Sequence, residues 1–111
     1  MNAYEIPELR FSLPAGSNVE RARFVSVNGN GEGVAAIAST QIVGVSMNKA
    51  DAGEVLEVAD GIVCVEASGA ITAGTAVYSD ANGKVTSSGT VSAGVAITSA
   101  TGTGQLVSIK L

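Results

Sequence analysis

The chain has 111 residues, one domain's worth, with ten acidic side chains against six basic ones, a net charge of −4, one Cys and no His. No zinc or other metal site is expected, because tetrahedral zinc needs several His or Cys ligands, and a Ser-His-Asp or Cys-His centre is impossible within one chain. Without a basic surplus to replace counterions, nucleic-acid binding is disfavoured as well. We therefore expect no enzyme, no cofactor and no nucleic-acid partner.

The first twenty residues differ from the rest and are expected to form an extended N-terminal arm (1–20). Leu9, Phe11 and Leu13 alternate with Arg10 and Ser12, which gives one apolar face. Such a segment is either the first strand of the domain or an arm that adds to a neighbouring chain, and we favour a docked arm. The candidate partner-binding residues are Tyr4, Ile6, Leu9, Phe11 and Leu13.

The remainder (21–111) predicts an all-β domain. Val, Ile and Thr make up 30 of the 111 residues and cluster in short runs between Gly, Asn, Asp and Ser. One short helical turn is expected near residues 18–22. The expected strands are Leu9–Leu13, Arg23–Val27, Gly33–Ala38, Gln41–Met47, Val55–Val58, Ile62–Glu66, Ala76–Ser79, Lys84–Thr86, Val91–Ile97 and Gln105–Lys110. Short antiparallel strands at this spacing indicate a small single-domain β-barrel or β-sandwich.

Glycines mark the turns and close approaches. Asn82-Gly83 lies between two strand-like runs and predicts a type I′ hairpin. The run from Asn28 to Gly33 predicts a longer, mobile hairpin loop. Gly44 and Gly94 each precede a Val inside a strand-like run, which predicts a bulge or a close backbone approach.

The sequence contains an internal repeat with a spacing of about fifty residues. Gly44-Val45-Ser46-Met47, Ala50, Gly53 and Val55-Leu56-Glu57-Val58 recur as Gly94-Val95-Ala96-Ile97, Ala100, Gly104 and Leu106-Val107-Ser108-Ile109, with one inserted residue. Each copy follows an Asn-Gly hairpin. The repeat predicts two related β-units that pack together.

Three other features have structural explanations. The glycine cluster at residues 29–33 lacks the Lys-Ser/Thr of a Walker loop and the helix of a dinucleotide fingerprint, so it predicts a hairpin tip. The acidic group Asp51, Glu54, Glu57, Asp60 and Glu66 fits neither a calcium loop nor a glycosidase pair, and predicts a solvated edge. Cys64 lies in an apolar run beside Glu66 and predicts a small core residue.

The N-terminus has no basic region followed by an apolar stretch, so no signal peptide is predicted. No window approaches 18 uninterrupted apolar residues, so no membrane partner is expected. We expect synthesis in a cytosol-like compartment, the cytoplasm.

The motifs of residues 70–86 and several shorter runs resemble those of the DUF2190-type phage capsid decoration, or cement, proteins. The resemblance rests on Ala70–Thr86 (AITAGTAVYSDANGKVT), Gly94-Val95-Ala96-Ile97 and Val107–Leu111, and on the earlier Gly44-Val45, Ala52-Gly53-Glu54-Val55 and Gly61-Ile62-Val63. It covers roughly residues 20 to 111. The N-terminal region departs from the family by a longer start and by the Asn28–Gly33 loop.

This resemblance implies a non-enzymatic β-barrel-like domain on the outside of a tailed-phage head. The implied partner is the major capsid protein, bound by trimers at three-fold and quasi-three-fold positions that stabilise the expanded shell. The alternatives are another phage structural module (a tail-tube, spike or head-fibre domain) or a small receptor- or carbohydrate-binding β-domain.

Overall fold

The computed structural model describes residues 3, 5–38 and 40–111, with nine β-strands and no helix in this part of the chain. The strands are β1 (Ile6–Pro14), β2 (Phe24–Val27), β3 (Gly33–Ala35), β4 (Gly44–Ser46), β5 (Val55–Glu66), β6 (Ala76–Ser79), β7 (Val85–Thr86), β8 (Ser92–Ala96) and β9 (Leu106–Lys110).

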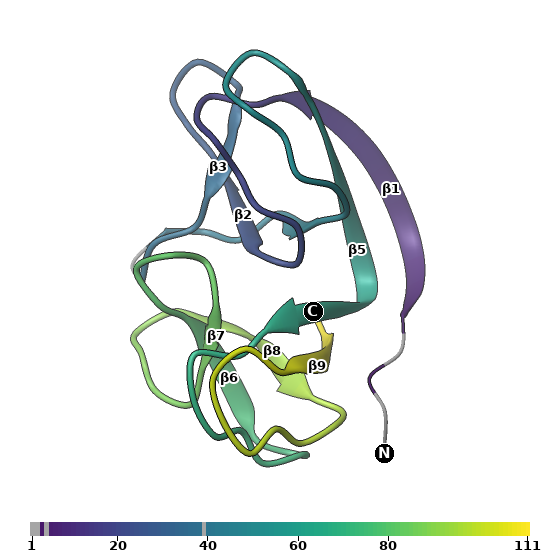
Figure 1. Cartoon of the computed structure of the whole chain (residues 1–111), viewed down its shortest axis with the longest axis vertical. Coiled ribbons are helices and arrows are strands. Elements are labelled where there is room, and N and C mark those ends of the chain that lie inside the picture. The colour runs from purple at the N-terminus through teal and green to yellow at the C-terminus, as the bar shows by residue number, and fades with distance from the viewer. Residues whose placement is uncertain (1–2, 4, 39) are drawn as a thin grey trace.

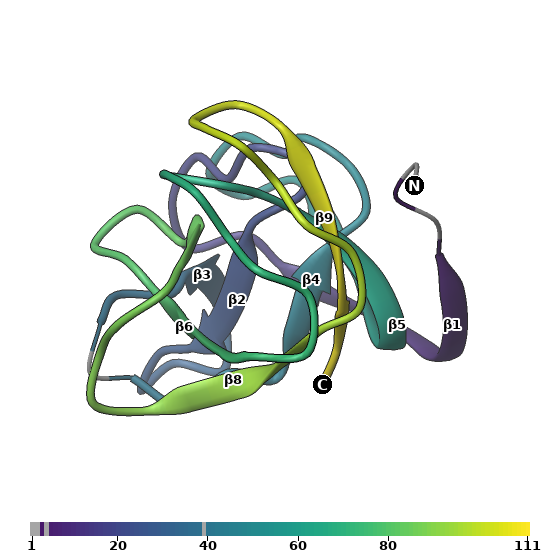
Figure 2. The same ribbon diagram turned by 90° about the horizontal axis from the view of Figure 1, so that it is seen from below.

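All nine strands belong to one curled antiparallel sheet. Its order is β3-β2-β4-β5-β9-β8-β6-β7, and β1 pairs with the opposite edge of β5. Figure 1 shows β1 to β3 and the start of β5 in the upper half, and β6 to β9 in the lower half. Seen from below, β9, β8 and β6 curve round into a half-barrel (Figure 2). The expected all-β, single-domain fold is confirmed.

Strand β5 joins the two halves, and it differs from the expectation of two separate strands. The chain continues through Gly61, which has a φ of +108°. A Cβ at Gly61 would lie 2.7 Å from the backbone nitrogen of Glu8 and 2.9 Å from the carbonyl oxygen of Ile6. Gly61 therefore bends the strand without ending it. The bend also changes which residues face inward, from Leu56 before it to Val63 after it.

The expected helical turn near residues 18–22 is wrong. Val19 and Ala50 exchange two backbone hydrogen bonds of 2.8 and 2.9 Å, which fixes this segment as a β-bridge. Ala22 then takes a left-handed conformation with a φ of +61°, which an α-helix cannot contain.

The hairpin at Asn82-Gly83 exists, but its turn is not type I′. Only Gly83 has a positive φ, whereas type I′ needs two such residues. The backbone N–H of Gly83 donates to the carbonyl of Asp80 (3.3 Å), and the Asp80 carboxylate accepts from Asn82 (2.8 Å) and Lys84 (2.9 Å). The Asp80 side chain thus stabilises a type I turn that is followed by a left-handed glycine.

The internal repeat is confirmed and is longer than the sequence comparison indicated. Unit 1 spans residues 10–59 and unit 2 spans residues 62–111, so that each half of β5 belongs to a different unit. Backbone hydrogen bonds recur at equivalent positions of the two units. Ala15 donates to Glu54 as Ala67 donates to Gln105, and Gly53 donates to Ala15 as Gly104 donates to Ala67. Val19 and Ala50 exchange two bonds, as Ile71 and Ala100 do. The loop at Asn28 has the same side-chain-stabilised turn as the one at Asp80.

Each unit has its own apolar core, and the two cores correspond residue by residue. The core of unit 1 is Ala15, Val19, Val25, Ala50, Leu56 and Val58. Its counterparts in unit 2 are Ala67, Ile71, Val77, Ala100, Val107 and Ile109. Four further residues of unit 1 pack into the cluster of unit 2, namely Phe24, Ala36, Val45 and Ala59. We call these four residues the junction face, because they join unit 1 to unit 2.

The close approaches expected at Gly44 and Gly94 are confirmed. A Cβ at Gly44 would lie 2.6 Å from the carbonyl oxygen of Ala59, and a Cβ at Gly94 would overlap the carbonyl oxygen of Lys110. The equivalent strands β4 and β8 therefore pass very close to β5 and β9, respectively.

Candidate interaction surface

The described part of the chain has two surface cavities and no cluster of metal-ligating side chains. Within residues 3, 5–38 and 40–111, no group of three or more Cys, Asp or Glu side chains could hold a metal ion. A surface cavity of about 250 Å³ is lined by Gln41, Ile42, Val43, Asp60, Val91, Ser92, Ala93 and Leu111. A second, of about 360 Å³, is lined by Asn18, Glu20, Arg23, Ala35, Ala81, Asn82 and Lys84. Both cavities lie where the two units meet.

A partly buried ion cluster borders the second cavity. The Glu66 carboxylate lies 3.1 Å from the Lys84 ammonium and 3.5 Å from the Arg23 guanidinium. Arg23 belongs to unit 1, whereas the other two residues belong to unit 2. These charges are paired across the junction, so the cluster serves to hold the two units together.

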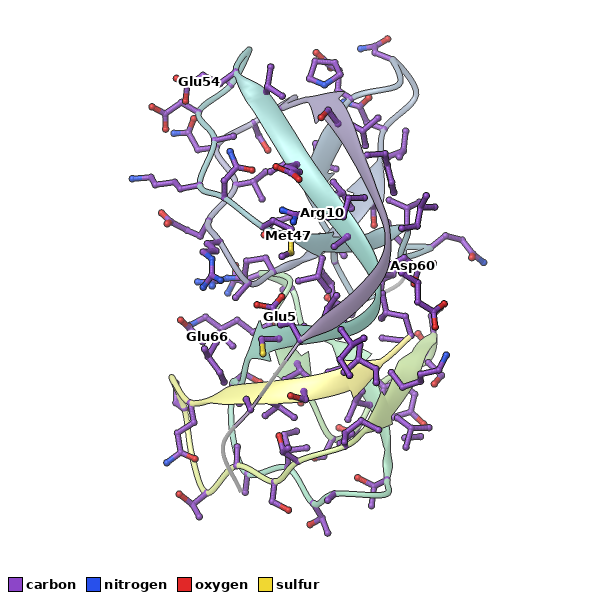
Figure 3. All side chains as sticks on the ribbon, turned by 90° about the vertical axis from the view of Figure 1, so that its right-hand side faces the viewer. Glu5, Arg10, Met47, Glu54, Asp60 and Glu66 are labelled. Atoms are coloured by element: carbon purple, nitrogen blue, oxygen red, sulfur yellow. The ribbon has the colours of Figure 1, made fainter. Side chains whose placement is uncertain are left out.

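The acidic residues singled out in the sequence are dispersed. Figure 3 shows Glu54, Asp60 and Glu66 at separate places on this side of the molecule. The Glu54 carboxylate accepts from the backbone N–H of Asp51 (2.8 Å), and Glu57 forms a 2.8 Å ion pair with Arg10. The contacts of Glu54 and Glu57 fit the predicted solvated edge, whereas Glu66 departs from it, because it is partly buried and pairs with Arg23 and Lys84 across the unit junction.

The five candidate binding residues of the N-terminal segment separate into distinct groups. Tyr4 lies outside the described residues. Phe11 and Leu13 are half-buried and pack against the core of unit 1, as the equivalent Val63 and Val65 do in unit 2. Ile6 and Leu9, by contrast, are each 57% exposed. They are therefore the two described candidates with most of their side chains available to a partner.

Strand β1 is also an integral part of the sheet in this chain. It pairs with β5 from Ile6 to Pro14, with one irregularity between Pro7 and Leu9. Arg10 and Glu57 join the two strands on the outer surface, where Figure 3 shows Arg10 near Met47. The structure thus adds a strand role for residues 6–14 to the binding role predicted from the sequence.

The sequence analysis did not find a row of three apolar residues and one lysine on the outside of unit 2. Cross-strand partners in an antiparallel sheet point to the same face, and one such row runs Ile62, Lys110, Val95 and Ala76 across β5, β9, β8 and β6. Val95 is 43% exposed, and Ile6 pairs with Ile62 at the end of the row. We call Ile62, Lys110, Val95 and Ala76 the outer row. The sequence of β8 gives no clean alternation, because its pairing with β6 shifts between Gly94 and Ser92, so it does not say which residues stay uncovered.

Cys64 is buried in β5, as expected, with its sulfur 3.9 Å from the hydroxyl of Ser108. Burial raises the pKa of the Cys64 thiol, against a smaller lowering of the pKa by the Ser108 contact. The thiolate is therefore scarce at neutral pH.

We expect Cys64 in the folded protein to react with iodoacetamide at least about tenfold more slowly than in urea-unfolded protein at the same pH, since reaction requires both opening and ionisation. Mass spectrometry of timed samples measures both rates. Equal rates would contradict the buried placement.

No helix in the described ranges is long and apolar enough to cross a membrane.

Comparison with known proteins identifies the family. A model of the phage cement protein family matches residues 6–111. Among solved structures, the crystal structure of the head fibre gp8.5 N base of bacteriophage phi29 has a similar fold, with a TM-score of 0.75, 24% sequence identity, and coverage of 91% of each chain. No curated protein matches. Because the family model spans both repeat units and all nine strands, the chain belongs to the phage cement protein family.

Proposed function

We propose that this protein decorates the outside of a tailed-phage head and stabilises the expanded shell by binding the major capsid protein. The observation that carries the proposal is the match of the phage cement family across residues 6–111. The chemistry of the chain is consistent with a structural role, since the described titratable groups are dispersed or paired across the unit junction. Its acidic charge suits an exterior position, away from packaged DNA.

The proposed bound form is a homotrimer at three-fold and quasi-three-fold positions. A small chain rich in Ala, Val and Gly presents little area to any one capsid subunit. Three linked copies that bind together gain affinity through effective concentration without any single large interface. If the trimer binds the expanded shell and not its precursor, it stabilises the expanded state by mass action.

A second candidate function is the base that attaches a head fibre. The structural likeness to the phi29 head fibre gp8.5 N base favours it, although at 24% identity that likeness establishes the fold alone. Both candidates require head binding, and electron microscopy of decorated heads separates them by whether a fibre projects from the bound protein.

The N-terminal segment (1–20) is the part of the chain for which we propose capsid contact, with Ile6 and Leu9 as its exposed apolar side chains. Replacing both by Ser should weaken binding to expanded heads by about tenfold or more, because apolar anchors dominate small interfaces. Co-sedimentation over a range of concentrations measures the change.

Val55→Ser is the matched control, because Val55 is an even more exposed apolar residue on the neighbouring strand β5. The control should bind normally. If the Ile6/Leu9 variant stays folded and binds as well as Val55→Ser, the proposed role of the segment is wrong.

A further inference from the structure

The junction between the two units uses two different surfaces. Unit 1 contributes the junction face, and unit 2 contributes the tip of its β6–β7 hairpin. The Gly83 carbonyl accepts a 2.7 Å hydrogen bond from the N–H of Phe24, and a Cβ at Gly83 would lie 3.3 Å from the Cβ of Arg23. Such a contact is heterologous, because the donating and receiving surfaces are not the same.

Because the units repeat, each also carries a copy of the surface that the other uses. Three residues of the outer row, together with Ser88, correspond to the junction face of unit 1. By strand pairing, Phe24, Val45 and Ala59 have the counterparts Ala76, Val95 and Lys110. The alignment of the β2–β3 hairpin with the β6–β7 hairpin, extended along both strands, makes Ser88 the counterpart of Ala36. All four residues of the junction face are fully buried, whereas all four counterparts are exposed. Figure 3 looks onto β9 and β8, which carry two of them.

The same contrast holds for the hairpin tips. Gly83 is buried against unit 1, while its counterpart Gly31 has φ +77° and open space where a side chain would begin. Ser79 is 2% exposed, while its counterpart Val27 is 44% exposed. Within the described part of one chain, therefore, the tip of the β2–β3 hairpin contacts no partner face, and the outer row of unit 2 is not covered by a hairpin tip.

We propose that a second copy of this chain supplies the missing contact, with the β2–β3 hairpin tip of one copy (Val27 to Glu32) on the outer row of the next. By analogy with the internal junction, the Gly31 carbonyl accepts from the N–H of Ala76. This contact continues the interface that already joins the units within one chain. A heterologous contact closes into a ring when its rotation permits, and the trimer proposed above is such a ring. The inference itself rests on the repeat and does not depend on capsid binding.

The first test measures mass in solution by sedimentation at several concentrations. Gly31→Asn places a side chain on the tip, in a left-handed conformation that Asn tolerates and in open space within the chain. Val95→Asp places a charge on the outer row. Each should raise the dissociation constant of the oligomer by about tenfold or more.

Matched controls keep the effect specific. Gly53→Asn changes a glycine with the same left-handed conformation and open surroundings, and Val55→Asp changes an exposed Val, both away from the tip and the outer row. Both controls should associate as the unmodified chain does. Circular dichroism confirms that each variant is folded.

The second test is a disulfide between copies. A Cβ at Gly83 would lie 3.3 Å from the Cβ of Arg23, slightly closer than the roughly 3.5–4.5 Å of a disulfide, so a small outward shift would permit the bond within one chain. Their counterparts Gly31 and Thr75 should be able to form the same bond between copies. With Cys64 replaced by Ala, a Gly31→Cys/Thr75→Cys chain should oxidise to covalent oligomers. The Gly83→Cys/Arg23→Cys chain, as a control, should oxidise within the monomer.

An unmodified chain that stays monomeric and a cysteine pair that forms no covalent oligomer would overturn the proposal. So would an oligomer whose mass is unaffected by both Gly31→Asn and Val95→Asp. Head binding is measured separately, so a capsid-binding protein that fails these tests would leave the proposed function standing and remove only this interface.

Discussion

Replacing Val77 by Asp is expected to leave the chain unfolded at room temperature. Val77 lies on β6, is fully buried in the core of unit 2, and pairs with Gly94 on β8. A carboxylate there would lose its hydration among aliphatic side chains, at a cost of several kcal/mol even after it takes up a proton. A domain of this size has a total stability of about 5–15 kcal/mol, and small side chains favour the lower end.

Far-ultraviolet circular dichroism and a thermal melt measure the outcome. Val55→Asp introduces the same charge in place of the same residue type at a position 66% exposed, and should change stability by no more than about 0.5 kcal/mol. A cooperative melt for Val77→Asp near that of the unmodified chain would show that the assignment of the inward face of β6 is wrong.

Gly94→Ala should cause the second largest loss. Gly94 has φ +147°, and the added methyl group would overlap the carbonyl of Lys110, so β8 and β9 would have to separate where they pair. Backbone strain and lost pairing together should cost about 3 kcal/mol or more, because a backbone carbonyl cannot move aside as a flexible side chain can.

The control is Gly104→Ala. Gly104 also has a positive φ, of +89°, but a Cβ there meets no atom within 4 Å. It should lose only about 1 kcal/mol, the usual cost of a left-handed Ala. Denaturant unfolding of both variants measures the difference, and equal losses would contradict the close approach of β8 to β9.

The sequence predicted strands correctly where a run of strand-forming residues is bounded on both sides by turn-forming residues. Strand β6 has the predicted bounds, and Gly44 and Gly94 make the predicted close approaches. The turn at Asn82-Gly83 was assigned the wrong type because the Asp80 side chain stabilises a type I turn by accepting two backbone N–H groups. Val55–Val58 and Ile62–Glu66 were predicted as two separate strands, although the lack of a Cβ at Gly61 lets β5 bend and continue.

Burial at the unit junction could not be predicted from the repeat alone. Val45 and Val95 occupy equivalent positions after equivalent glycines, yet Val45 is fully buried and Val95 is 43% exposed. The difference lies in what covers each residue, since unit 2 packs on Val45. Local sequence does not encode such a covering contact, so the residues of β8 do not reveal that Val95 is solvent-exposed.

The same reasoning applies to the candidate binding residues. The alternation of Leu9, Phe11 and Leu13 correctly placed Phe11 and Leu13 on one apolar face, but that face packs onto the core of unit 1. Leu9 is in the same unbroken register as Phe11 and Leu13, but it lies opposite Asp60, beyond the core cluster that those two residues contact, and so stays exposed. Where the core ends along β1 is set by its partner strand β5, about fifty residues away in the sequence, so the alternation of β1 alone could not predict it.

The abundance of small side chains gives the domain a modest core, so assembly on a head is the state in which its stability should be greatest. The most direct measurement of the proposed function is the thermal rupture of expanded heads that lack the protein, with and without purified protein added back. We predict that the added protein survives washing on expanded heads, raises their rupture temperature, and leaves precursor shells undecorated. Unchanged rupture at protein concentrations well above those of the capsid sites would contradict the account.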